Sequence, residues 1–196
     1  MNAVAKPSRP VSQPACKPNI APIRFDAIWN AYHGGHPSQA KDANGDLLYK
    51  DQCAIKLSVA LHGAGVDMNG FTGAFTVIDG KRAALRAAEL AGWLNKVPFC
   101  GLPMKPENVT GSDWKTKISG RTGIAYFSDY WVRDGGKASN PTGDHIDLWN
   151  KSTLPASIES VMRFQLGIPR VPNFFGPGNW YSNLDDAKTI LFWEIR

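Results

Sequence analysis

One cysteine stands where a polar loop turns into an apolar helix. Cys53 begins the run CAIKLSVALHG, and Asp51 just before it suits an N-cap. We therefore expect a helix over about residues 52–63 with Cys53 at its second position. A helix N-terminus offers partial positive charge and free backbone N–H groups, which lower the pKa of a thiol and can hold an oxyanion. The placement of Cys53 thus indicates a thiol nucleophile.

The general base that such a thiol needs has to come from another element. The sequence has four histidines. His33 and His36 lie in a Gly-rich loop, and His62 lies nine residues along the same helix, about 13 Å away at a rise of 1.5 Å per residue. His145, near the start of the predicted strand 143–150, remains as the partner of the thiol.

The strand that carries His145 also carries a carboxylate on the same face. Side chains two positions apart on a strand point to the same side, so Asp147 can orient the His145 ring, while Asp144 and Ile146 face the other way. Residue types alone leave a second interpretation open. A cysteine in an apolar helix is more often a core residue than a nucleophile, and a strand histidine is more often structural.

The composition is that of a folded globular protein with a modest positive charge. The 196 residues are 43% hydrophobic, and 22 basic residues against 17 acidic ones give a net charge of +5. The charge favours an anionic partner, but no run of five Lys and Arg residues appears, which argues against nucleic-acid binding. No stretch approaches the roughly 20 apolar residues of a membrane span, so we expect no membrane insertion.

The N-terminal stretch differs in composition from the rest. Residues 1–22 contain five prolines and no apolar core, which predicts a flexible lead followed by a single domain, 23–196. The lead is neither a secretory signal nor a lipoprotein signal, despite Cys16, so we expect the chain to be made in the cytoplasm.

The remaining cysteines and the metal-like motifs are expected to carry no chemistry. Three cysteines cannot all pair with one another, which argues against a disulfide framework and leaves Cys16 and Cys100 as bystanders. DANGD (42–46) has its glycine one place too early for a calcium loop, and HGGH (33–36) lacks an accompanying CxxC or HExxH. We expect neither a metal nor another cofactor.

The order of the predicted elements favours an α+β fold, with an antiparallel sheet packed against a central helix that carries the cysteine. The helix 52–63 is apolar on nearly all sides, as a helix buried between other layers would be. The other predicted elements are helices at 24–33, 80–97 and 157–166, an irregular stretch at 98–121, strands at 123–131, 143–150 and 189–195, and a helical turn at 184–188.

Three segments together resemble a known family. CAIKLSVAL, GDHIDLWN and the ending NLDDAKTILFWEI are similar to the type VI secretion amidase effectors of the Tae4 group, over most of residues 24–196. The resemblance implies a papain-like, NlpC/P60-type cysteine peptidase fold. It also implies that Cys53 is the nucleophile and His145 the base, in the right order along the chain.

The same resemblance implies a function. Such an enzyme hydrolyses the γ-D-glutamyl–meso-diaminopimelate bond of peptidoglycan stem peptides. It is delivered by the type VI secretion machinery without a signal peptide, acts in the periplasm of a recipient cell, and is restrained by a cognate immunity protein. An acidic immunity protein would suit the net charge of +5. The alternatives are a non-catalytic wall-binding or interaction module and a housekeeping cell-wall hydrolase, although the latter ordinarily carries a signal peptide.

The third catalytic residue departs from the family pattern. Family members take an acid from the loop after the LWN segment, but the corresponding loop here, 151–156, contains none. Asp147 is the expected substitute on strand geometry, and Glu159 is the second candidate. Tyr49 and Trp149 flank the two motifs and are candidate substrate contacts, with core packing an equal alternative for Trp149.

Overall fold

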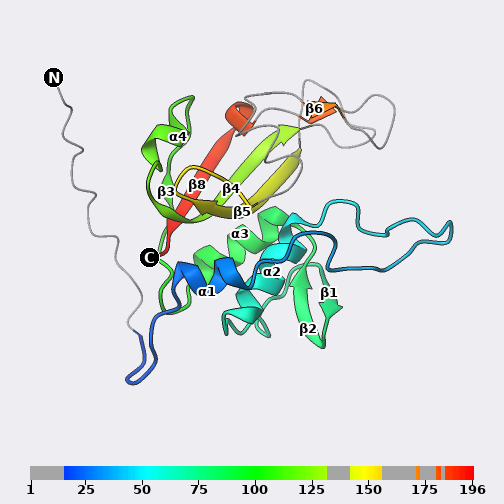
Figure 1. Cartoon of the computed structure of the whole chain (residues 1–196), viewed down its shortest axis with the longest axis horizontal. Coiled ribbons are helices and arrows are strands. Elements are labelled where there is room, and N and C mark those ends of the chain that lie inside the picture. The colour runs from blue at the N-terminus through cyan, green and yellow to red at the C-terminus, as the bar shows by residue number, and fades with distance from the viewer. Residues whose placement is uncertain (1–15, 132–141, 156–170, 173–179, 182–183) are drawn as a thin grey trace.

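The computed structural model of the protein describes residues 16–131, 142–155, 171–172, 180–181 and 184–196. Figure 1 shows helices α1 to α3 on one side of a twisted sheet, with α4 on another side of that sheet. The elements in chain order are α1 (Phe25–Asn30), α2 (Cys53–Gly63), β1 (Phe75–Ile78), β2 (Lys81–Ala84), α3 (Ala87–Lys96), β3 (Glu107–Asn108), α4 (Trp114–Lys117), β4 (Thr122–Trp131), β5 (Gly143–Asn150), β6 (Val171–Pro172), β7 (Trp180–Tyr181), the 3-10 turn η2 (Leu184–Asp186) and β8 (Thr189–Glu194).

The main sheet has four antiparallel strands in the order β3-β8-β4-β5. β4 is the central long strand, and it pairs with β5 in a register that sets Phe127 opposite His145 and Ala125 opposite Asp147. The predicted strands at 123–131, 143–150 and 189–195 are confirmed as β4, β5 and β8. Among the residues that the structure describes, β5 is the outer strand on its side of the sheet, so the chemistry-bearing residues of that strand lie at a sheet edge.

Helix α2 is the central helix that its apolar sequence predicted. Ala54, Leu57 and Leu61 are at most 1% exposed, and α2 packs against α1, α3 and one face of the sheet. The core on this face includes Ile124, Ile146, Leu148 and Trp193, and a second core on the opposite face includes Trp114, Phe127, Trp149 and Phe192. The predicted α+β architecture, an antiparallel sheet packed on a helix, is confirmed.

The helix predicted over 80–97 is wrong in its first part. The structure has a β-hairpin, β1 and β2, before the shorter helix α3. Asp79 and Gly80 connect the two strands with φ values of 49° and 74°, as a two-residue hairpin turn with both residues in the left-handed region requires. The sequence signal was the Asp-Gly pair between TVI and KRA, which outweighs the helical propensity of the alanines.

The stretch 98–121 was expected to be irregular and contains two short elements. Strand β3 pairs with β8 through Glu107 and Asn108, and α4 places Trp114 in the second core. The helical turn predicted at 184–188 is present as η2. The helix predicted at 157–166 lies outside the described residues.

The expectation that Cys16 and Cys100 are bystanders is wrong. The two form a disulfide, with their Cα atoms 5.1 Å apart. Two of three cysteines can pair while the third stays free, which an argument from the odd count overlooked. Backbone contacts hold the N-terminal segment next to Cys100. The Ile23 N–H donates to the Cys100 carbonyl at 2.9 Å. Gly101 lies so close to the backbone of Ile23 that a Cβ at position 101 would collide with the Ile23 oxygen.

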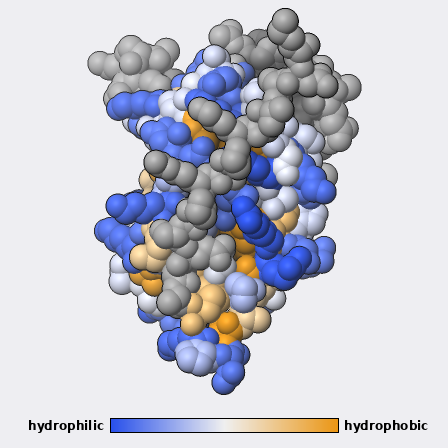
Figure 2. All heavy atoms as spheres, turned by 90° about the vertical axis from the view of Figure 1, so that its left-hand side faces the viewer, coloured by the Kyte–Doolittle hydropathy of each residue, from blue (hydrophilic) through white to orange (hydrophobic). Residues whose placement is uncertain are grey.

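One face of the protein is mostly polar. The face seen in Figure 2 is predominantly hydrophilic, with smaller hydrophobic patches in its lower half. Within the part of the chain that the structure describes, no helix combines the length and the apolar character that crossing a bilayer demands. Six large hydrophobic side chains among the described residues are exposed: Ile20, Leu48, Phe75, Val77, Val97 and Met104.

Candidate active site

Cys53 is the first residue of α2 rather than the second. Gln52 and not Asp51 is the N-cap, because the first helical hydrogen bond runs from Lys56 N–H to the Gln52 carbonyl at 2.8 Å. Cys53 is half-buried and carries a free thiol. The Gln52 side chain does not cap the helix. The N–H groups of the first turn have no acceptor within an α-helix, so they face outward beside the sulfur.

His145 and Asp147 lie next to each other at the start of β5. Their Nε2 and Oδ2 atoms are 3.4 Å apart, and the two side chains are 22% and 10% exposed. The other carboxylate oxygen of Asp147, Oδ1, accepts a hydrogen bond from the Leu148 N–H at 2.8 Å. This bond fixes the carboxylate, which in turn restrains the imidazole ring.

The imidazole of His145 contacts the sulfur as well as the carboxylate. Burial acts to lower the pKa of His145, but hydrogen bonds to Asp147 and to Cys53, together with the charges of both groups, raise it to about 10. At neutral pH this imidazole therefore carries a proton and a positive charge. A cation in contact with sulfur stabilises the thiolate, which is the nucleophilic form of cysteine.

The contact between Cys53 and His145 joins two elements, α2 and β5. Cys53 packs against the core that contains α2, whereas the His145 ring faces Phe127 of the second core, with ring centroids 6.3 Å apart. β5 is the outer strand of the sheet in the described part of the chain, and α2 packs against it. The three residues that sequence spacing selected are thereby brought together from two elements.

The other candidate residues have different surroundings. Trp149 is 1% exposed, and its Nε1–H donates to the Ile118 carbonyl at 3.0 Å, so its contacts are those of the core-packing alternative. Tyr49 is half-buried in the segment just before α2. Glu159 lies outside the described residues. His62 makes contacts of its own with the carbonyl oxygens of Val66 and Arg82 and takes no part in the site.

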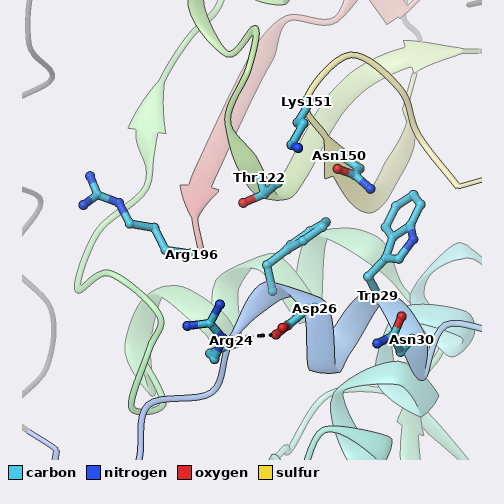
Figure 3. A pocket seen from close by; sticks show the side chains of 9 residues that line it. Arg24, Asp26, Trp29, Asn30, Thr122, Asn150, Lys151 and Arg196 are labelled. Carbon is cyan, nitrogen blue, oxygen red and sulfur yellow. Dashed lines mark hydrogen bonds and ion pairs between the residues drawn. The ribbon is translucent and has the colours of Figure 1, made fainter.

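The described residues form no metal cluster at this site. No group of three or more His, Cys, Asp and Glu side chains within them is placed to hold a metal ion. A pocket of about 350 Å³ lies elsewhere, between α1 and the far end of β5 (Figure 3). Arg24, Trp29, Asn150 and Lys151 are among its lining residues, and Arg24 pairs with Asp26 at its rim. None of the candidate catalytic residues lines it.

The sequence profile of one family matches more than half of the chain. Residues 49–193 match Tae4, the type VI secretion system (T6SS) amidase effector protein 4. The chain belongs to the Tae4 family. This Tae4 chain is therefore an amidase effector of type VI secretion, a hydrolase, as the resemblance of its motifs implied. The matched region includes Cys53, His145 and Asp147.

Solved structures of Tae4 proteins share the fold of this family member. The Tae4–Tai4 effector–immunity complex from Enterobacter cloacae contains a chain with a TM-score of 0.55 and 18% identity, covering 90% of this chain and 100% of its own. The Tae4/Tai4 effector–immunity system from Salmonella typhimurium matches with a TM-score of 0.55 and 16% identity, over 90% and 100% of the two chains. Among curated proteins, none matches the sequence. The predicted papain-like fold agrees with this family.

One buried residue of the site region escaped the sequence analysis. Gln52 is 3% exposed, and its amide makes three hydrogen bonds to the segment before α2. The sequence did contain a signal for Gln52, because it is a polar residue directly before the nucleophile, at the boundary of an apolar helix.

Proposed function

We propose that this Tae4 protein is a cysteine-dependent peptidoglycan amidase that hydrolyses the γ-D-glutamyl–meso-diaminopimelate bond of the stem peptide. The observation that carries the proposal is the contact of His145 with both Cys53 and Asp147. A thiol, an imidazole and a carboxylate in this order are the groups that acyl transfer from an amide requires.

The proposed reaction begins from a thiolate–imidazolium pair. The Cys53 thiolate attacks the carbonyl carbon of the γ-D-glutamyl amide, and a C–S bond forms as the carbonyl π bond opens. The backbone N–H groups of the first turn of α2 hydrogen-bond the resulting oxyanion. When the tetrahedral intermediate collapses, the C–N bond breaks and His145 donates its proton to the departing amine of diaminopimelate.

Water completes the turnover. His145, now neutral, accepts a proton from a water molecule whose oxygen attacks the thioester. The C–S bond then breaks, the glutamyl carboxylate leaves, and the thiolate–imidazolium pair is restored. No step requires a metal or another cofactor. Asp147 keeps the imidazole oriented and stabilises its positive charge throughout, which is the role that we assign to it in place of Glu159.

We also propose delivery by the type VI secretion machinery into the periplasm of a recipient cell, with a cognate immunity protein that protects the producer. The effector–immunity complexes of the Tae4 proteins from Enterobacter cloacae and Salmonella typhimurium support the partner. The Cys16–Cys100 disulfide supports the compartment, because such bonds persist in the oxidising periplasm and are rare in the cytosol.

Mass spectrometry of digested peptidoglycan tests the proposal. Purified sacculi incubated with the protein should release fragments with a new γ-D-glutamyl carboxylate and a new diaminopimelate amine. Cys53→Ala and His145→Ala should each release none of these fragments while keeping the circular dichroism spectrum of the native protein. Release by either variant at the native rate would refute the mechanism, and a different new terminus would refute the assigned bond.

A further inference from the structure

A buried amide directly before the nucleophile is bonded to a loop rather than to the helix. Ser38 N–H donates to Oε1 of Gln52 at 2.9 Å, and Nε2 of Gln52 donates to the carbonyls of Ser38 and Tyr49, each at 2.9 Å. Gln52 thus pairs with both backbone groups of Ser38, as a neighbouring strand would.

These bonds exhaust the donors of the Gln52 amide. An NH₂ group has two hydrogens, and the two carbonyl oxygens take both of them. The Gln52 side chain therefore has no N–H left for an oxyanion at Cys53, although it is adjacent in sequence. Its side chain faces the segment between Ser38 and Tyr49 instead.

That segment is a projecting hairpin, residues 38–49, which extends from the body of the protein beside α2 (Figure 1, blue to cyan). It is held internally: Leu48 N–H donates to the Ala40 carbonyl at 2.8 Å, and Lys41 and Leu47 form a β-bridge. The Asp42 carboxylate closes the tip by accepting the N–H groups of two residues of the turn. These internal bonds define its shape but not its angle to α2.

The base of the hairpin is joined to the catalytic helix through Gln52. Ser38 and Tyr49 stand at the two ends of the hairpin, and the same side chain binds both. Because Gln52 is also the N-cap residue of α2, its backbone and its side chain connect the hairpin base to the position of Cys53. Next to that base, the Leu48 side chain is 51% exposed.

We infer that Gln52 is a positioning residue that fixes the projecting hairpin as one wall of the substrate site beside Cys53. The hairpin then contacts the stem peptide through the residues near its base, Leu48 and Tyr49. This inference rests on the proposed function. It makes Gln52 a determinant of substrate binding and not of the chemical step.

Steady-state kinetics on a soluble stem-peptide muropeptide test the inference. Gln52→Met keeps the length of the side chain and removes all three hydrogen bonds, and Gln52→Glu keeps an acceptor for Ser38 but removes both donors. Both variants should raise KM about tenfold while kcat changes less than about threefold, because binding is lost equally in the ground and transition states. Ser58→Ala is the matched control. It removes a buried hydroxyl of the same helix, which donates to the Ala54 carbonyl and accepts from Ala84 N–H, away from the hairpin.

Hydrogen exchange gives a second readout that does not depend on turnover. In Gln52→Met the Ser38 amide should lose protection about tenfold or more, whereas the Leu48 amide, bonded within the hairpin, should keep its protection. In Ser58→Ala both amides should exchange as in the native protein.

Two outcomes would overturn the inference. One is a lower thermal stability of both Gln52 variants with KM and kcat within twofold of native values. The other is a fall in kcat at unchanged KM, which would mean that Gln52 orients Cys53 and not the hairpin. If the native protein itself fails to cleave the muropeptide, the proposed function fails, while altered Ser38 exchange would still report the hairpin connection.

Discussion

Two cysteine sites in this chain contain the same side chain and differ in everything around it. Cys53 stands at the start of a buried helix, in contact with an imidazole that Asp147 keeps protonated. Cys16 and Cys100 lie where the N-terminal segment runs along the loop after α3, and they are joined to each other.

The difference shows that the groups next to a cysteine determine its chemical role. A thiol beside a cation and a helix N-terminus is stabilised as thiolate and becomes a nucleophile. A thiol beside a second thiol at bonding distance becomes a cross-link, whose effect is on the unfolded chain and not on any reaction. Four experiments can break or sharpen this comparison.

The largest expected effect is on catalysis at Cys53. Cys53→Ala should lower the rate of stem-peptide hydrolysis by about ten-thousandfold or more, because no other group can form the acyl intermediate. The measurement is release of fragments from sacculi by liquid chromatography. The double variant Cys16→Ser/Cys100→Ser is the control, and it should keep at least half of the native rate at 25 °C. If the double variant loses as much activity as Cys53→Ala, the division of roles between the two sites is wrong.

The disulfide should dominate the stability comparison. Its cysteines are 84 residues apart in sequence, and the chain-entropy relation for a loop of that length gives a loss of about 4.5 kcal/mol on reduction. Chemical denaturation of the oxidised protein and of Cys16→Ser/Cys100→Ser measures it, with Cys53→Ser as the control that should change stability little. Equal stabilities of the oxidised protein and the double variant would contradict this expectation.

The Asp147 carboxylate should determine how kcat/KM depends on pH. The raised pKa of His145, about 10, means that the imidazolium is lost only as the pH rises through that region, so kcat/KM should persist well above pH 7. Asp147→Asn removes the anion that favours the proton, so the alkaline limb should move down toward the ordinary histidine value near 6.5.

The rate of the same variant provides a second measure. At pH 7, Asp147→Asn should lower kcat/KM by about a hundredfold. A pH–rate profile of native protein and variant gives both numbers. Asp144→Asn, which alters a carboxylate on the other face of β5, is the matched control. If the alkaline limb of Asp147→Asn lay at the same pH as that of the native protein, the catalytic role assigned to Asp147 would be wrong.

The smallest expected effect is on thiol reactivity. At pH 7, iodoacetamide should label Cys53 in the oxidised native protein, and His145→Ala should slow that labelling by about tenfold because the neighbouring cation is gone. Peptide mapping by mass spectrometry identifies the labelled residue. His62→Ala serves as a control for loss of a histidine, and it should label at the native rate. Equal labelling rates for the native protein and His145→Ala would indicate that Cys53 is a core cysteine and not an activated nucleophile.

Much of the fold was predictable because its signals are local. The apolar run of α2 and the β-rich segments of β4, β5 and β8 indicated their elements correctly, since periodicity and side-chain type act within a few residues. The β1–β2 hairpin was missed although its Asp-Gly turn is a local signal too. The short strand β3 is different, because two residues become a strand only when β8 is there to pair with them.

The site was predictable in part for the same reason. Strand alternation puts His145 and Asp147 on one face, and the helix boundary puts Cys53 near an N-terminus, so both halves of the site follow from sequence. The distance between the halves does not. The burial of Gln52 and Trp149 could not be predicted either, because whether a polar or aromatic side chain is buried depends on residues far away in the chain.

The sequence by itself determined which residues could do chemistry and which faces they occupy, because those properties depend on residue type and on the repeat of a single helix or strand. Only the tertiary structure decided that Cys53 of α2 meets His145 of β5, that Cys16 meets Cys100, and that the Gln52 side chain binds Ser38. Each of these is a contact between segments separated along the chain, and such contacts are set by the packing of the whole core.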